Sequence, residues 1–393
     1  MKRLTAFLLA ALTALACCAC GYTPKQTTPA ASVEPTTTIT VPTPKNTMTG
    51  EELMKDMKIG WNLGNTFDAP DGEISWGMPF TTPEILQKVK EMGFHTIRIP
   101  ISWHKHVSAA PEYTIDETWM DRVDTVVNQA LDLGMYVIIN SHHDNNIYVP
   151  TPDNQEAASV YLTAIWSQIA EHFKDADYHL IFQCMNEPRV EGTAYEWNII
   201  PSNPDCMAAV EVVNVLNQTV VDTIRATGGR NADRWIIVSP YVANAGAAAL
   251  SSFRLPTDPA NKLIVSMHSY APYNLCLNVH SDVTDFTRGD YSDISTPIKS
   301  LHNKFVSKGI PVIIDEMGCR NKENDEARYE WAKYYVSTAA KYGMVCIWWD
   351  NGVVTTSSEG FGILNRRKLE VYEQSKRVLQ GLMDGLTQED ADA

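Results

Sequence analysis

Short apolar runs rich in β-branched residues recur eight times along the chain, with helix-like stretches between them. The runs are apolar almost throughout and do not alternate with polar residues, so we expect strands that are buried on both faces. Parallel strands covered by helices have this property. The runs lie at residues 58–61, 96–99, 136–139, 180–182, 235–238, 263–265, 311–314 and 344–347.

The stretches between the runs carry the signals of helix ends. Thr82 followed by Pro83 is typical of a helix N-terminus, and Gly93 and Gly134 are typical of helix C-termini. Eight strand–helix units in succession favour a (β/α)8 TIM barrel over a doubly wound open sheet, which would usually be shorter. No linker-like segment interrupts residues 48–384, so we expect a single barrel domain there, followed by an acidic tail at 385–393.

The first 20 residues have the pattern of an export signal. A positive start precedes an apolar run at residues 4–16, which is too short to span a bilayer comfortably. Cys17, Cys18 and Cys20 stand where a bacterial lipoprotein carries its lipidated cysteine, although an ordinary cleaved signal would also fit this pattern. We therefore expect a secreted protein or a cell-surface lipoprotein, attached to the membrane through a lipidated N-terminal Cys.

Residues 21–47 read as a disordered linker. Nine Thr and five Pro fall within residues 22–47, with almost no side chains that could form a core. Such a segment cannot bury enough apolar surface to offset the entropy of ordering it, and its prolines favour extended conformations. We expect it to act as a spacer that holds the barrel away from the cell surface.

Composition excludes some classes of partner. The chain carries 47 acidic and 32 basic side chains, a net charge of -15, whereas a nucleic-acid binder needs a concentrated cationic surface. The five cysteines after residue 47 lack CxxC spacing, which argues against a zinc site or a full disulfide framework. A bond between Cys206 and Cys276 stays open at this stage.

Polar and aromatic residues stand directly after most of the apolar runs, where a barrel collects its active site. Glu187 follows the fourth run and Glu316 the seventh, and those strands approach each other across the barrel mouth. Two facing carboxyls are what glycoside hydrolysis requires. The alternative is that both are salt-bridge partners at the rim. Other residues just past the runs are Asn62, Asn65, Arg98, His142, His143, Asn186, His268, Tyr270, Trp348 and Trp349.

Each carboxyl has an expected role. Glu316 as a nucleophile must be ionised, which a nearby Arg98 would favour. Glu187 must be protonated when substrate arrives, and we expect repulsion from Glu316 to raise its pKa. His268 and Tyr270, at i and i+2 on an extended segment, point to the same side and could orient the nucleophile. Asn186 could donate to the sugar 2-OH.

The remaining motifs point less clearly to a role. His142 and His143 suggest a metal, but neighbours on an extended strand face opposite ways, so we expect no metal site there, and no cofactor motif is evident. By the same alternation, one of Trp348 and Trp349 should enter the core and the other the site. Trp76 lies in a loop, where sugar stacking and simple packing are both open.

Seven segments in order resemble glycoside hydrolase family 5, with the greatest similarity to bacterial endoglucanases of its subfamily 4. The resemblance covers about residues 48–382 and implies a (β/α)8 barrel, a retaining mechanism, Glu187 as acid/base and Glu316 as nucleophile. It also implies active-site roles for Arg98, His142, Asn186, His268, Tyr270 and Trp349, and sugar-binding roles for Asn65 and His143. The segments are 60–69, 98–100, 141–144, 185–189, 268–270, 315–318 and 348–352.

Two positions depart from the family pattern. Met78 stands where similar sequences often carry Asn, which puts one sugar contact in doubt. Gln183 and Cys184 stand where a Glu is frequent, a change that we expect to affect packing more than chemistry.

The function that follows from these expectations is a retaining endo-β-1,4-glucanase. Its polysaccharide substrate would be a cellulose-like glucan, mixed-linkage glucan or xyloglucan, and we expect it to act as a monomer. A β-mannanase or xylanase of the same family is an alternative enzyme. A non-catalytic glycan-binding surface lipoprotein is an alternative of another class.

Overall fold

The computed structural model describes residues 45–387. The expected export signal and nearly all of the expected linker lie outside the described residues, as do residues 388–393 of the expected acidic tail. Within residues 45–387, no helix combines the length and the apolar character that crossing a membrane requires.

Eight parallel strands close into a barrel in sequence order, and each predicted apolar run has become one of them. The (β/α)8 fold expected from the sequence is therefore confirmed. The later strands extend further than predicted, so that Glu316 and Trp349 lie inside strands rather than beyond them. The strands are β1 Ile59–Leu63, β2 Thr96–Ile99, β3 Tyr136–Asn140, β4 Leu180–Gln183, β5 Ile236–Val238, β6 Leu263–Ser269, β7 Val312–Met317 and β8 Val345–Asp350.

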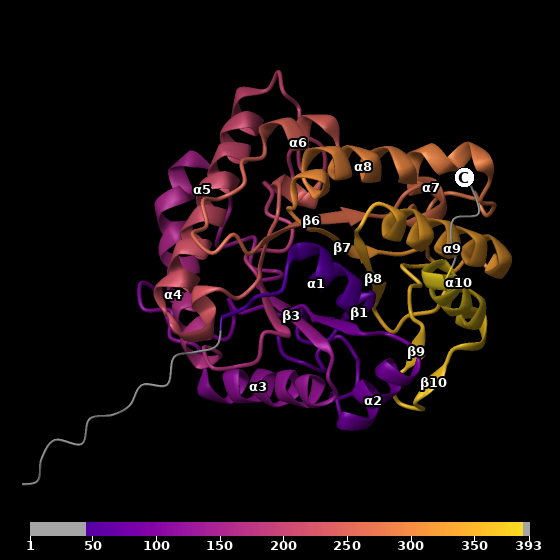
Figure 1. The fold of residues 1–393 in the computed structure, drawn as a ribbon, viewed down its shortest axis with the longest axis horizontal. Coiled ribbons are helices and arrows are strands. Elements are labelled where there is room, and N and C mark those ends of the chain that lie inside the picture. The colour runs from indigo at the N-terminus through magenta and orange to yellow at the C-terminus, as the bar shows by residue number, and fades with distance from the viewer. Residues whose placement is uncertain (1–44, 388–393) are drawn as a thin grey trace, which may run out of the picture. The chain divides into compact units, whose positions relative to one another are not determined.

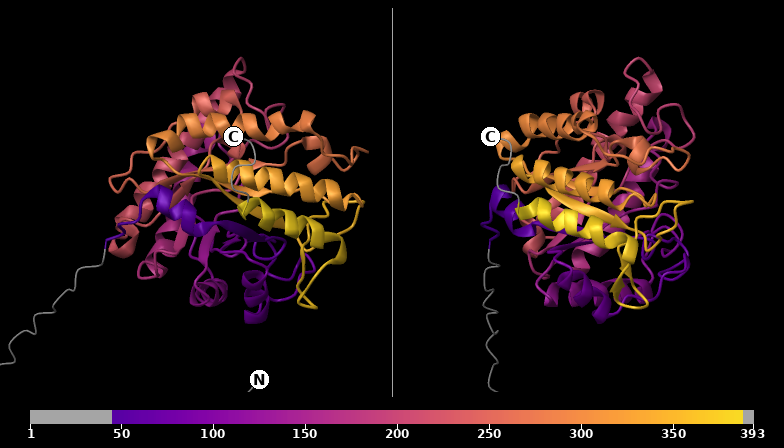
Figure 2. Two further views of the ribbon diagram at one scale, coloured as in Figure 1. Left: turned by 45° about the vertical axis from the view of Figure 1, so that its right-hand side comes forward. Right: turned by 90° about the vertical axis from the view of Figure 1, so that its right-hand side faces the viewer.

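Helices surround this barrel, as Figures 1 and 2 show. The α-helices are α1 Gly50–Met57, α2 Pro83–Glu91, α3 Glu117–Asp132, α4 Gln155–His172, α5 Pro204–Ala226, α6 Ala247–Ser252, α7 Tyr273–Cys276, α8 Tyr291–Lys304, α9 Asp325–Lys341 and α10 Lys376–Thr387. The short 3-10 helices are η1 Pro152–Asn154, η2 Gly229–Ala232, η3 Tyr241–Ala243, η4 Arg288–Asp290, η5 Val306–Lys308 and η6 Glu373–Ser375.

Helix α2 illustrates how local sequence sets these boundaries. It begins at Pro83 after Thr82, as predicted, although the Thr82 side chain makes no capping hydrogen bond. Proline at the first helical position lacks only an N–H that would be unpaired in any case. Gly93 follows the helix with φ at 101°, a conformation that side chains with a Cβ disfavour.

The barrel interior and the strand–helix layer form separate apolar cores. Ile138, Ile237 and Ile264 are fully buried inside the barrel, where Leu53 and Met57 of α1 join them. Helix α1 therefore closes the N-terminal end of the barrel, and Figure 1 shows it in front of the strands. The opposite end, where the strands finish, is left for the site.

A short antiparallel hairpin, β9 Leu364–Asn365 with β10 Glu370–Val371, was not predicted. Between its strands, Arg366 is buried and donates to the carbonyl oxygens of Gly64 and Asp350 at 2.8 and 2.6 Å. The Trp61 indole donates to the Asp350 carboxylate at 2.8 Å. These contacts join the ends of β1 and β8, where the barrel closes.

The cysteines and the surface charges bear on two earlier expectations. All five described cysteines are buried and unpaired, so the bond between Cys206 and Cys276 is not formed. Cys276 instead lies beside the thiol of Cys319.

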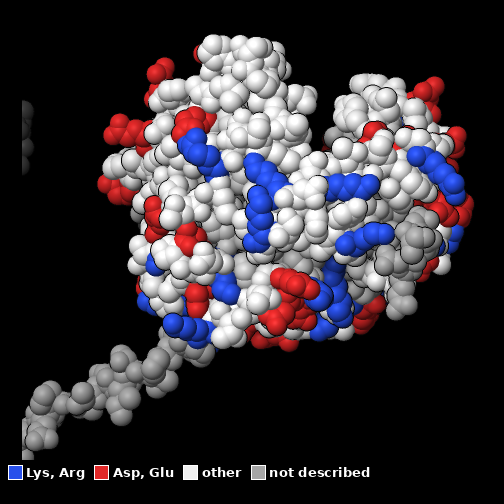
Figure 3. Space-filling model, turned by 45° about the horizontal axis from the view of Figure 1, so that its top comes forward, with Lys and Arg blue, Asp and Glu red and all other residues white. Residues whose placement is uncertain are grey.

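On the face drawn in Figure 3, basic side chains are scattered among acidic and uncharged ones, unlike the concentrated cationic surface of nucleic-acid binders.

Candidate active site

The structure brings Glu187 and Glu316 together at the C-terminal end of the barrel. Glu187 lies in the loop after β4 and Glu316 in β7, and a carboxylate oxygen of each lies within 4.8 Å of the other. Their side chains are 16% and 8% exposed, so solvent reaches both without surrounding either. This proximity is compatible with the spacing of about 5–5.5 Å between carboxyl groups at which one carboxyl attacks a sugar carbon directly.

Glu316 is held on both of its oxygens. Arg98, fully buried on β2, donates to Oε1 at 2.8 Å, and the Tyr270 hydroxyl donates to Oε2 at 3.1 Å. Burial and the neighbouring Glu316 raise the pKa of Tyr270 well above its usual value, so its hydroxyl keeps the proton that it donates. Both contacts are those expected from the sequence.

The Arg98 guanidinium has further partners. It donates to Asn186 Oδ1 at 2.6 Å, Asn62 Oδ1 at 2.9 Å and Gln183 Oε1 at 2.8 Å. Gln183 in turn donates to Asp315 Oδ2 at 2.6 Å. The departure at Gln183 was expected to affect packing more than chemistry, and the structure adds that its amide connects the arginine to a buried carboxylate.

Asp315 is a member of the site that the sequence did not reveal. It is fully buried, and it accepts hydrogen bonds from Ser266 and Gln183, each at 2.6 Å. Strict alternation along β7 would send Asp315 and Glu316 to opposite faces. The pairing of β7 with β8 is irregular between Ile314 and Met317, and such irregularities re-aim side chains. Two consecutive acidic residues at a strand end were the available signal.

His268 contacts Glu187 more closely than the nucleophile that it was expected to orient. Its Nδ1 lies 2.6 Å from Glu187 Oε1 and 3.5 Å from Glu316 Oε2. Burial lowers the pKa of His268, but Glu316, Asp315 and the Glu187 hydrogen bond outweigh burial and raise it to about 10. The imidazole is therefore a cation held between three carboxylates.

The pKa values of Glu187 and Glu316 shift in the opposite directions to those expected, which were a raised pKa for Glu187 and an ionised Glu316. Burial raises the pKa of Glu187, but the hydrogen bond and charge of His268, with the charge of Arg189, lower it below its usual value. Burial also raises the pKa of Glu316, and there the cations His268 and Arg98 offset burial only in part. The sequence showed Arg98 beside Glu316 but not the two cations beside Glu187, and so the predicted order was wrong.

A row of aromatic rings borders the pair. The Trp349 ring lies parallel to the His142 ring, with centroids 5.9 Å apart, and the His143 ring lies 4.4 Å from that of His142. Trp76 continues the row, 5.7 Å from His143, and is 45% exposed. Trp348 is fully buried and donates to the carbonyl of Phe361. Both tryptophans are buried, Trp348 fully and Trp349 at 9% exposure, and Trp349 is the one that faces the ring of His142.

The two histidines do not point apart as strand alternation predicted, because β3 already ends at Asn140. Donor atoms of His142, His143 and Asp68 all lie within 4.8 Å of one another, an arrangement that resembles a metal site. The Asp68 carboxylate, however, already accepts the backbone N–H groups of Asn65 and Thr66 at 2.9 and 2.6 Å. A cation there would compete with these hydrogen bonds.

Asn65, the other expected sugar-binding residue, lies in the turn directly after β1. Its backbone has φ at 56°, a conformation that Asn tolerates better than most residues. The hydrogen bond from its N–H to Asp68 fixes this turn at the rim of the cleft.

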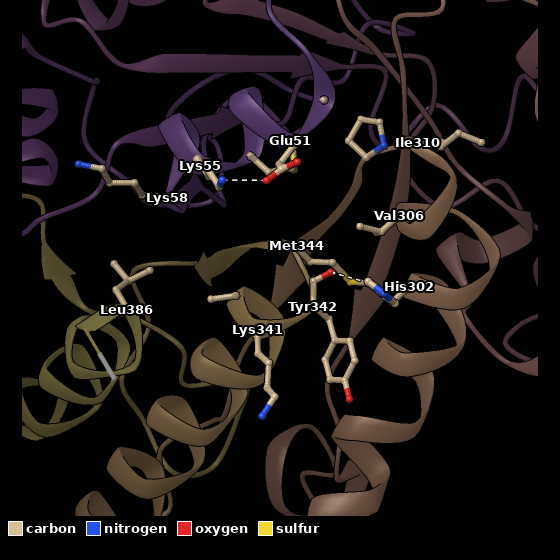
Figure 4. A pocket seen from close by; sticks show the side chains of 16 residues that line it. Glu51, Lys55, Lys58, His302, Val306, Ile310, Lys341, Tyr342, Met344 and Leu386 are labelled. Carbon is tan, nitrogen blue, oxygen red and sulfur yellow. Dashed lines mark hydrogen bonds and ion pairs between the residues drawn. The ribbon is translucent and has the colours of Figure 1, made fainter. Parts of the chain in front are cut away.

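A pocket of about 760 Å³ lies at the other end of the barrel (Figure 4). Helix α1 and the segments that precede β7 and β8 line it. Two of its charged groups, Glu51 and Lys55, form an ion pair at 2.8 Å. The His302 ring contacts the Tyr342 carbonyl oxygen at 3.2 Å. Catalytic groups of TIM barrels gather at the strand C-termini, so this pocket is not the active site.

Comparisons with known proteins agree with this geometry. The family model described as cellulase (glycosyl hydrolase family 5) matches residues 56–354. Endoglucanase B of Clostridium cellulovorans is 43% identical over 326 residues, which span 82% of this chain and 73% of the relative.

Two solved structures have the same fold and related sequences. One is a broad-specificity endoglucanase of subfamily 4 from Ruminococcus champanellensis with bound cellotriose, at 43% identity and a TM-score of 0.81. The match covers 86% of this chain and 99% of that one. The other is a family 5 lichenase from Caldicellulosiruptor sp. F32, at 40% identity and a TM-score of 0.83, with 88% and 97% covered.

We predict that the His268→Gln variant loses more stability at pH 6 than at pH 9. The raised pKa of His268, about 10 against 6.5 unfolded, stabilises the fold fully below pH 6.5. That contribution declines as the pH rises and is lost above about 10. Urea unfolding of wild type and variant at both pH values measures the difference in free energy.

The exposed His280 supplies a control, because His280→Gln should change stability little at either pH. A difference between wild type and His268→Gln that stays constant or grows toward pH 9 would contradict the protonated state of His268.

Proposed function

The chain belongs to glycosyl hydrolase family 5 and is an endoglucanase, and from that premise we propose that Glu187 and Glu316 cleave internal β-1,4-glucan bonds with retention of configuration. The observation that carries the proposal is the distance between the two carboxylates, within 4.8 Å. A gap of that size places one carboxylate against the anomeric carbon and the other against the glycosidic oxygen.

In the first step an oxygen of Glu316 attacks the anomeric carbon. The bond from that carbon to the glycosidic oxygen breaks, and Glu187 gives its proton to the departing oxygen. The product is a glycosyl ester of Glu316 and a shortened glucan. Arg98 and Tyr270 donate to the two oxygens of Glu316, which favours the ionised nucleophile and fixes its direction.

The proton for this step is shared by Glu187 and His268. In the substrate-free site it lies on the imidazole, whose Nδ1 is 2.6 Å from the Glu187 carboxylate. A bound sugar excludes water from Glu187, and desolvation favours the neutral carboxyl. The proton then moves from Nδ1 to Glu187, which passes it to the leaving oxygen.

In the second step water takes the place of the departed sugar. Once Glu316 is esterified its negative charge is gone, and Glu187 accepts a proton from the water as that water attacks the anomeric carbon. The ester bond breaks, Glu316 returns as a carboxylate, and the released sugar keeps the β configuration.

The remaining site residues bind and orient the sugar in this proposal. Asn186, held by Arg98 at 2.6 Å, lies next to Glu187 and reaches the 2-OH. Trp349 offers an aromatic face beside the reacting sugar, with His142 behind it. Asn65 and His143 contribute polar groups at the rim. Burial lowers the pKa of His142 well below its usual value, so it acts as a neutral hydrogen-bonding group.

We also propose that the enzyme is exported and attached to the cell surface through one of Cys17, Cys18 and Cys20. The apolar run before these residues and the Thr/Pro-rich stretch after them support this proposal. A clickable palmitate analogue fed to the producing bacterium should label the protein, and one Cys→Ala variant among the three should lose the label. Absence of label on the wild type would reject lipid attachment, and label on all three variants would reject attachment through a single one of these cysteines.

Glu316→Gln should lower kcat at least about 1,000-fold, and Glu187→Gln about 100- to 10,000-fold, on a soluble β-glucan. Each variant removes a group that both chemical steps need. Reducing-end release measures the loss, and proton NMR of the first product formed by the wild type should show the β-anomer.

The exposed Glu330 on α9 gives a matched control, since Glu330→Gln makes the same chemical change far from the cleft and should leave kcat unaltered. Near-normal turnover in either active-site variant would exclude the two-carboxyl mechanism. A first product in the α configuration would exclude retention.

A panel of carboxymethyl cellulose, mixed-linkage glucan, xyloglucan, xylan and mannan decides the substrate. We predict hydrolysis of the first two, because the chain is similar to an endoglucanase and a lichenase. Greater kcat/KM on mannan or xylan would replace the proposal with the mannanase or xylanase alternative. Retention of oligosaccharide with no reducing-end release on any polymer would indicate a non-catalytic binding protein.

A further inference from the structure

Strand β7 carries one residue more than its neighbours at the place where the site lies. On β6, Met267 and His268 are consecutive. Their partners on β7 are Ile314 and Glu316, so Asp315 is an extra residue between them. The pairing of β7 with β8 is irregular over the same residues. An extra residue of this kind re-aims the side chains around it, and both Asp315 and Glu316 lie 3.5 Å from His268.

The Asp315 carboxylate is fully buried and held on both of its oxygens. Oδ1 accepts from Ser266 and Oδ2 from Gln183, each at 2.6 Å. Oδ1 also lies 3.5 Å from His268 Nε2, and Oδ2 lies 3.8 Å from Arg98 Nε. Burial raises the pKa of Asp315, but His268 and Arg98 lower it below its usual value. The carboxylate is therefore an ionised group between two buried cations.

Of these two cations, His268 is the one whose charge depends on Asp315. Arg98 donates to Glu316 and to three side-chain amide oxygens, and a guanidinium stays charged in proteins. The Nε2 of His268 is buried and has no hydrogen-bond partner among the described residues. Glu187 and Glu316 lie at Nδ1, whereas Asp315 lies at Nε2. Its charge thus faces the end of the imidazole that the other two carboxylates do not face.

The charge on this imidazole matters because of the proton that it shares with Glu187. Burial lowers the pKa of His268, but the charges of Glu316 and Asp315 and the hydrogen bond to Glu187 raise it to about 10. In the proposed mechanism Glu316 loses its charge when it is esterified, and Glu187 alternates between acid and base. Asp315 reacts in neither step, so it keeps its charge throughout.

We propose, resting on the function proposed above, that Asp315 is a positioning residue that holds the shared proton on His268 and Glu187 through both chemical steps. It acts through His268 and not on the sugar. The extra residue in β7 then supplies a permanent negative charge behind the two carboxyls that react. Asp315 therefore determines how far the pH can rise before the acid is lost.

Asp315→Asn tests this role, because it removes the charge and keeps the shape. The new amide can still accept from Gln183 and donate to the Ser266 hydroxyl. An opposite charge at this range shifts a pKa by about 1–3 units, and without it the imidazolium gives up its proton at lower pH. The basic limb of kcat/KM on cellotetraose should therefore move about 1–3 pH units lower. NMR of the His268 ring, identified by its absence in His268→Gln, should show the same movement.

A substrate that needs no acid separates this role from damage to the site. Cellotetraose has a sugar leaving group that needs a proton, whereas β-cellobiosyl fluoride releases a fluoride ion. On the fluoride, kcat/KM of wild type and of Asp315→Asn should persist above the basic limb that each shows on cellotetraose. A variant that had only displaced Arg98 or Glu316 would lose activity on both substrates at every pH.

The contact between Gln183 and Asp315 offers a rescue. In the double variant Gln183→Glu, Asp315→Asn, carboxylate and amide exchange places across the same 2.6 Å hydrogen bond. The buried negative charge returns to the same network, so the basic limb should move back toward its wild-type position. Asp315→Ser removes the charge without adding an amide and should lower the limb as well, which keeps the test open if Asp315→Asn does not fold.

Asp258 supplies the matched control for loss of a buried carboxylate. It precedes β6, away from the strand ends that carry the site, and pairs with Arg225 at 2.8 Å. Asp258→Asn makes the same chemical change as Asp315→Asn and costs stability, but it should leave the basic limb where it is.

The other groups that could set the basic limb are the same in wild type and variant. Glu316 faces the proton-sharing pair from β7. The remaining charged or titratable groups around His268 and Glu187 are Arg98, His142, His143, Arg189, Tyr270 and Glu359. Because none of them is replaced, the difference between the two profiles reports Asp315.

Failure of this inference is distinguishable from failure of the proposed function. If wild type hydrolyses neither cellotetraose nor β-cellobiosyl fluoride, the retaining glucanase itself is rejected. If wild type hydrolyses both, a basic limb that does not move in Asp315→Asn, or that moves equally on both substrates, rejects only the role of Asp315. A double variant that recovers none of the shift would also overturn this role, because the shift would then come from lost contacts and not from lost charge.

Discussion

The buried positive charge of Arg98 is the constraint on which the catalytic end of the barrel depends. A guanidinium without solvent contact is costly unless every part of it is matched by acceptors. Here Asn62 comes from β1, Gln183 from β4, Asn186 from the loop after β4 and Glu316 from β7. One side chain on β2 thereby fixes polar side chains at the C-terminal ends of β1, β4 and β7. Glu316, the proposed nucleophile, is placed by the same interaction that keeps the charge buried.

The charges around Arg98 also explain how one site could hold the acid and the ionised nucleophile of the proposed mechanism. Three carboxylates, Glu187, Asp315 and Glu316, surround His268, and Asp315 lies behind it, 3.5 Å from its Nε2. A cationic imidazole stabilises all three carboxylates at once. Because the imidazole and Glu187 share one proton across 2.6 Å, small changes in solvation decide which of them carries it. Substrate binding is such a change, so in the proposed mechanism the acid is formed when it is needed.

How far the sequence predicts this site depends on how regular the backbone is. Eight apolar runs predicted eight strands, because burial on both faces leaves a clear pattern, and the residues that follow them predicted where Glu187 and Glu316 meet. Prediction failed where the backbone departs from strict alternation. Asp315 lies on an irregular part of β7, and His142 and His143 lie beyond the end of β3. The loop after β4 follows a course that depends on contacts with the loop after β5, which no periodicity encodes.

The loops that follow β6 and β8 are held by a different kind of interaction from the one that holds Arg98. Arg320, buried after β7, donates to the carbonyl oxygens of Asn278 and Ser358 at 3.1 Å, in the loops that follow β6 and β8. Lys322 donates to three more carbonyl oxygens in the loop after β6, at 2.7 to 3.0 Å. Both cations bind backbone oxygens, which every residue type possesses. The side chains of these loops can therefore change while the path of the backbone is kept.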